Sequence, residues 1–159
     1  MPRWHGTAAV ANRRAGCQPA PRQRSRAGPV RLQQDQREAL EYVRRHLPPG
    51  KTPYVGTATH RLVYFNDALF YFLADRPQAT RFDMFLPGVT NSAAGQSEIL
   101  RNLEEKQVEY VVLFSAPVSH EPNGSSVDSG VTLLDDAIEK GYAEATRFGR
   151  YTVLRRDPR

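Results

Sequence analysis

From Gln33 onward, hydrophobic and polar positions alternate in runs typical of short helices and strands. Leu40, Val43 and Leu47 recur at spacings of three and four, which is the period of a helix with one buried face. Acidic residues come early in this run and basic residues late, as the helix dipole favours, and Pro48-Pro49-Gly50 cannot continue it. The pattern predicts a first helix whose charged residues form a solvated face.

Continuous apolar runs predict the strands. Tyr110 to Phe114, YVVLF, is apolar and rich in β-branched residues, which indicates a buried strand near the centre of a sheet. Lys51 to Gly56 predicts a shorter buried strand. Leu62 to Phe65 fits either a second strand or an apolar segment beneath a helix, because periodicity cannot separate the two.

Three further helices and a hairpin complete the predicted fold. Asn66 or Asp67 is expected to cap a helix that runs to about Ala74, with four large apolar residues largely buried: Leu69, Phe70, Phe72 and Leu73. Asn91 or Ser92 caps the next helix, which buries Ile99, Leu100 and Leu103. A fourth helix ends at Gly141 and turns Leu133, Leu134, Ala137 and Ile138 inward. Two strands flank Gly149-Arg150 as a closing hairpin.

The fold class predicted from these elements is α/β, a small mixed β-sheet of about four strands packed with about four helices.

Charge divides the chain into two parts. The formal net charge is +5, yet residues 1 to 31 hold seven arginines and no acid. The rest of the chain contains 15 basic and 17 acidic residues, so it is nearly neutral. We interpret residues 1 to 32 as a disordered basic tail, because few large apolar side chains are present to offset the entropy of ordering, and residues 33 to 157 as a single α/β domain. The tail also fits a nucleic-acid or anionic-lipid arm, a transit peptide, or the product of a misplaced start codon in a GC-rich genome.

The sequence offers no catalytic motif that stands alone. Four scattered histidines lack metal-ligand spacing and Cys17 is the only cysteine, so neither a metal site nor a cofactor is predicted. Ser119-His120 lacks the strand-turn-helix elbow of a nucleophile. Asp135 and Asp136 are expected to point to opposite sides of a solvated helical turn. The polar loop of residues 115 to 130 exceeds the usual connection and is expected to be functional or mobile.

The stretch of residues 66 to 82, NDALFYFLADRPQATRF, holds most of the candidate binding residues. Arginines at the ends of a short helix suit phosphate or carboxylate recognition, so we predict one rim formed by Arg61, Asn66, Asp67, Arg76, Thr80 and Arg81. A plainer interpretation makes Asn66 or Asp67 a cap, Asp75-Arg76 a local ion pair and Arg81 a solvated strand-edge residue.

Residues 33 to 156 resemble the C-terminal extracytoplasmic domain of bacterial polytopic GT-C-type glycosyltransferases, relatives of the protein mannosyltransferases and aminoarabinose transferases. The likeness lies in HLPPGKTPYVG, FNDALFYFLADRPQATRF, SEILRNLEEKQVEYVVLF, SSVDSGVTLLDDAIEKGY and RFGRYTVLRR. It implies a membrane-bound parent enzyme that moves a sugar from a polyprenyl-phosphate carrier to a glycan or protein acceptor. The family's catalytic aspartate lies in an early loop between transmembrane helices.

This chain has neither such helices nor such a loop, and no signal peptide is evident, so its location by itself is left open. We therefore expect a domain without activity of its own that recognises carrier or acceptor through a membrane subunit, or that is structural. The alternative is a free-standing α/β interaction or ligand-binding module. A specific nucleic-acid partner is not expected, although salt-dependent binding through the tail is a third hypothesis.

Overall fold

A computed structural model describes residues 31–115, 117 and 121–158. In chain order its elements are α1 (Gln34–His46), β1 (Tyr54–Thr57), α2 (Ala68–Ala74), α3 (Ala93–Glu105), β2 (Tyr110–Phe114), the 3₁₀ turn η1 (Gly124–Ser126), α4 (Leu133–Gly141), β3 (Tyr142–Phe148) and β4 (Tyr151–Arg156). The α/β class, the four strands, the four helices and the closing hairpin are confirmed. Residues 1–30, which are most of the predicted tail, and Ser119-His120 lie outside the described residues, whereas Leu32 at the end of the predicted tail packs partly buried against the core.

The sheet is mixed, with strand order β1-β2-β4-β3. β1 and β2 are parallel, with Val55 opposite Val112, whereas β2–β4 and β4–β3 are antiparallel. β2 lies inside the sheet, as its continuous apolar run predicted. Because β1 and β2 are parallel, the loops that follow them leave from the same edge of the sheet.

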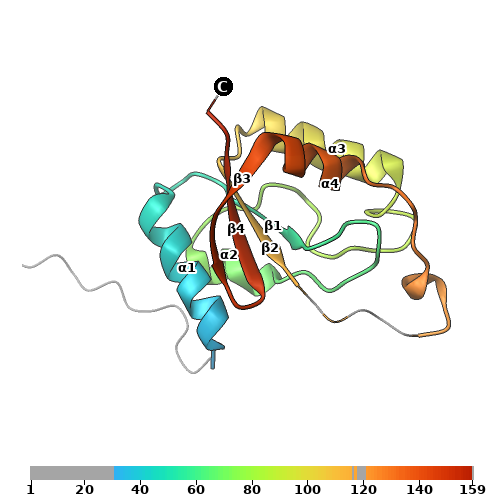
Figure 1. The fold of residues 1–159 in the computed structure, drawn as a ribbon, viewed down its shortest axis with the longest axis horizontal. Helices are drawn as coiled ribbons and strands as arrows, with labels where there is room; N and C mark the ends of the chain where they lie inside the picture. The colour runs from blue at the N-terminus through green and yellow to red at the C-terminus, as the bar shows by residue number, and fades with distance from the viewer. Residues whose placement is uncertain (1–30, 116, 118–120, 159) are drawn as a thin grey trace, which may run out of the picture.

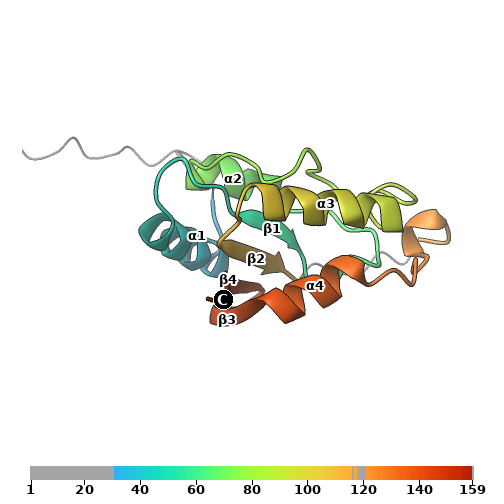
Figure 2. The same cartoon turned by 90° about the horizontal axis from the view of Figure 1, so that it is seen from above.

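Helices cover both faces of the sheet, and a hydrophobic cluster fills each interface (Figures 1 and 2). Successive strand residues alternate between the clusters, since side chains of a strand point to opposite faces. Val55 and Val112 pack with α1 and α2, while Tyr54 and Val111 pack with α3 and α4. Leu40 and Val43 of α1, predicted as its inner face, are fully or nearly fully buried.

Three sequence predictions of burial or secondary structure are wrong. Of the two alternatives for residues 62 to 65, the strand is wrong, because these residues form none; Tyr64 is buried and Phe65 is 80% exposed. Leu69 and Phe72 lie on the outer side of α2, because this seven-residue helix contacts the core along only one face, through Phe70, Tyr71 and Leu73. Leu133 is exposed for the same reason at the start of α4.

Within the described residues, no helix is long and apolar enough to cross a membrane.

Candidate functional site

Asn66 and Asp67 tie the start of α2 to the sheet and to α1, and neither caps α2 through its side chain. The Asn66 amide donates to the carbonyl of Val55, at 2.7 Å. The Asp67 carboxylate accepts from the Tyr151 hydroxyl, at 2.7 Å, and from the Gln36 amide, at 2.8 Å. Asp67 occupies the predicted N-cap position, but the predicted capping hydrogen bond is not formed, because its carboxylate is directed toward Tyr151 and Gln36 instead of the first turn.

Arg76 joins the C-terminal ends of two helices. Its guanidinium donates to the carbonyl of Leu47 at the end of α1, at 2.7 Å, and to the carbonyls of Ala74 and Asp75 at the end of α2. A cation at this place is favoured by both helix dipoles. The buried Nε has no hydrogen-bond partner in the described part of the chain. Arg76 therefore has a structural role that accounts for most of its donors.

The remaining residues of the predicted rim have separate partners. Arg61 forms an ion pair with Asp128, at 3.3 Å, and Arg81 binds both carboxylate oxygens of Glu98 from an exposed position. Thr80 is buried and donates to the carbonyl of Phe82. The six residues of the predicted rim therefore contact different partners in the described structure. Of these residues, only Arg61 and Arg81 keep exposed guanidinium groups.

A buried polar network lies at the carboxyl end of β1. The side chain of His60 is fully buried; its Nδ1 lies 2.6 Å from Asp135 and its Nε2 lies 3.0 Å from the Tyr54 hydroxyl. The backbone N–H of His60 also donates to the Asp135 carboxylate. Gly56 leaves space for this arrangement, because a Cβ there would lie 2.8 Å from His60 Nε2. The network joins the loop after β1 to α4.

Gln96 of α3 extends this network to a third segment. Its side-chain amide donates to the carbonyls of His60 and Val131, and its oxygen accepts from the N–H of Leu134. All hydrogen-bonding groups of this buried side chain are used except one lone pair, which suits a structural group. Gln96 was missed because a single glutamine on a helix carries no periodic signal.

The pKa of Asp135 agrees with a structural role for its carboxylate in this network. Burial raises its pKa most strongly, but hydrogen bonds and charge from His60, with a smaller contribution from Arg61, outweigh burial and lower the pKa below the ordinary 3.8. Burial also raises the pKa of Tyr54 well above its usual 10.0. The prediction that Asp135 lies on a solvated face is wrong, whereas Asp136 is exposed and bonds Thr132 nearby. The side chains of His60 and Tyr54 are closed to solvent.

The loops above this network expose an apolar surface. We call it the loop-end apolar surface and define it by Phe65, Leu69, Met84, Leu86, Val89 and Val127, which are 41–80% exposed. Hydrogen bonds bring its three segments together: Phe85 N–H donates to the carbonyl of Tyr64, and Ser129 N–H donates to that of Arg61. Large apolar side chains exposed on segments that hydrogen bonds hold together are candidates for an interaction site.

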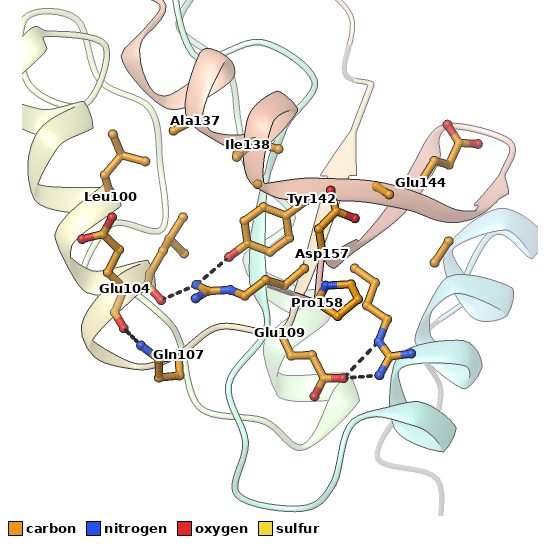
Figure 3. Close-up of a pocket in the computed structure, with 16 residues that line it drawn as sticks. Leu100, Glu104, Gln107, Glu109, Ala137, Ile138, Tyr142, Glu144, Asp157 and Pro158 are labelled. Carbon is orange, nitrogen blue, oxygen red and sulfur yellow. Dashed lines mark hydrogen bonds and ion pairs between the residues drawn. The ribbon is translucent and has the colours of Figure 1, made fainter.

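A groove of about 970 Å³ lies at the opposite end of the sheet, where α3 and α4 end (Figure 3). Leu100, Ile138 and Tyr142 form apolar parts of its wall, and Glu104 and Asp157 lie on its rim. A smaller hollow of about 670 Å³ lies beside Arg44 and Arg76. The described residues hold no cluster of His, Cys, Asp and Glu that could bind a metal ion.

Comparison with known proteins gives one structural similarity to report. Neither a protein-family model nor a curated protein matches the sequence. Among solved structures, the chain aligns with the C-terminal globular domain of an oligosaccharyltransferase from Archaeoglobus fulgidus. The TM-score is 0.46 and the sequence identity 11%, over 80% of this chain and 100% of that one.

Proposed function

We propose that this chain is a non-catalytic, extracytoplasmic domain of a bacterial polyprenyl-phosphate-sugar-dependent glycosyltransferase system, and that it docks on the membrane-bound subunit to help recognise carrier or acceptor. The glycosyltransferase part of this proposal rests on the family resemblance of the sequence. The observation that carries docking is the loop-end apolar surface, which the described residues leave exposed although each face of the sheet has its own buried hydrophobic cluster. Burying such a surface against a partner stabilises the complex.

A protein partner suits this surface better than a bare lipid surface. The guanidinium groups beside it are neutralised within the domain, Arg61 by Asp128 and Arg81 by Glu98. Attraction to anionic lipid headgroups depends on clustered basic residues that are not neutralised in this way. An apolar surface with a neutral rim instead matches an apolar patch on another protein.

Arg61 and Arg81 are the residues of the predicted rim best suited to meet a carrier phosphate, because both keep exposed guanidinium groups. A carrier phosphate would have to displace Asp128 from Arg61 or Glu98 from Arg81. Asn66, Asp67, Arg76 and Thr80 would support the rim from within. Titration with geranyl phosphate tests this role: Arg61→Ala and Arg81→Ala should each weaken binding several-fold, and unchanged affinity in both would remove them from the site.

Site-specific cross-linking tests docking. A photoreactive phenylalanine at position 65 should cross-link in cells to a polytopic glycosyltransferase, identified by mass spectrometry, whereas the same group in place of Glu41 on α1 should not. Cross-links from position 65 to lipid alone, or to no membrane protein, would contradict the proposal. Sugar transfer catalysed by the purified chain would contradict its non-catalytic part.

A further inference from the structure

The groove at the ends of α3 and α4 is suited to guanidinium groups, and one already occupies its floor. Arg156 donates to the carbonyls of Val108, at 2.9 Å, and Leu103, at 3.2 Å, and to the Tyr142 hydroxyl, at 3.0 Å. Its guanidinium also lies 5.4 Å from the centre of the Tyr142 ring. Carbonyl oxygens, a hydroxyl and an aromatic face thus together hold an arginine here.

Helix dipoles and carboxylates add negative potential to the groove. α3 ends at Glu105 and α4 at Gly141, so two negative helix ends lie beside it. Four carboxylates line it against two guanidinium groups, those of Arg155 and Arg156. The carboxylates are those of Glu104, Glu109, Glu144 and Asp157.

Two of these carboxylates are available for a ligand. Glu109 is paired with Arg155 and Glu144 with Arg147. For the side chains of Glu104 and Asp157, no hydrogen bond or ion pair exists within the described residues, and both are exposed. In Figure 3 the Tyr142 ring lies between Glu104 and Asp157, so the free carboxylates flank an apolar, aromatic surface. This combination favours an arginine side chain, which pairs its head with a carboxylate and lays its stem on apolar groups.

We propose that the arginine-rich segment of residues 1–30 of this same chain binds in this groove. This segment holds six of the chain's arginines and no acidic residue, which complements the groove. It joins the domain at Arg31, just before α1, which contacts β3 and β4. Thirty residues can span about 100 Å when extended, well beyond the radius of gyration of about 14 Å expected for a domain of about 125 residues. The groove is therefore within its reach.

Cys17, the only cysteine, allows a direct test in the full-length chain. A nitroxide attached to Cys17 should selectively broaden the amide NMR signals of Gly141, Ala143, Ala145 and Asp157. The broadening should fall at least several-fold in Glu104→Gln/Asp157→Asn and in high salt, because it depends on charge pairing. Glu105→Gln, on the same helix but outside the groove, should leave it unchanged.

Different outcomes overturn the proposal in different ways. Broadening concentrated elsewhere, or spread evenly over the domain, would place the segment outside the groove. Broadening at the groove that survives both the double substitution and high salt would exclude the carboxylates as its basis. Equal broadening in a mixture of nitroxide-labelled unenriched chain and isotope-labelled chain would assign the contact to a second copy. None of these results depends on docking to a membrane subunit.

Discussion

The two ends of the sheet are built in different ways. At the carboxyl end of β1 and β2, long loops are held by the buried network of His60, Asp135 and Gln96. At the other end, short turns join α3 to β2 and α4 to β3, and Arg156 donates to the carbonyls of Val108 and Leu103. Long loops bring many backbone polar groups that need internal partners, whereas short turns satisfy most of theirs locally. The buried network therefore holds the loop after β1 against α3 and α4, which the short turns at the other end do not require.

Breaking the network at the carboxyl end should have the largest effect. His60→Leu leaves Asp135 and the Tyr54 hydroxyl without their shared partner in a buried site, so we expect a loss of about 3 kcal/mol in the free energy of unfolding. Urea denaturation measures it. Tyr54→Phe removes one hydrogen bond and should cost about 1 kcal/mol. Equal costs for the two substitutions would show that Asp135 does not depend on His60.

Arg156→Leu tests the opposite end and should cost less, about 2 kcal/mol, because three acceptors lose a donor that is itself only partly buried. Arg155→Leu is the matched control, since its ion pair with Glu109 is exposed and should contribute little. A larger loss for Arg156→Leu than for His60→Leu would reverse the comparison between the two ends.

Substitution of two arginines of the predicted rim should affect stability to different extents. Arg76→Leu removes donors from carbonyls at the ends of α1 and α2, so a loss of about 1 to 2 kcal/mol is expected. Arg81→Leu should leave the melting temperature unchanged, because its ion pair with Glu98 is exposed to solvent. A destabilised Arg81 variant would mean that this pair has a structural role.

Acid should destabilise the carboxyl end of the sheet by a small amount. The pKa of Asp135 is lower in the folded chain than its ordinary 3.8, so folding favours the ionised form. This contribution is present above the unfolded pKa and is lost as pH falls through the lower, folded one. Melting temperature measured from pH 6 to pH 2 should therefore fall less steeply in Asp135→Asn than in the unaltered chain. Identical slopes would show that Asp35, whose pKa Arg150 lowers, or other carboxylates account for the acid response.

The sequence determined the elements and their burial pattern wherever local periodicity was strong. The run of residues 110 to 114 identified an interior strand, the stripe of Leu40 and Val43 identified the inner face of α1, and the turn at Gly149-Arg150 identified the hairpin. These features follow from side-chain direction and turn chemistry within a few residues, which the sequence expresses directly.

Only the tertiary structure decided the roles of the polar residues. His60 and Asp135 are 75 positions apart, and Asp67 and Tyr151 are 84 apart, so neither pair has a local signature. Asp67 looked like a cap, Asp135 like a solvated acid and Arg76 like half of an ion pair, because each was judged against its neighbours in sequence. Their partners come from strands and helices that only the folded sheet brings together, and a polar side chain takes its role from those partners.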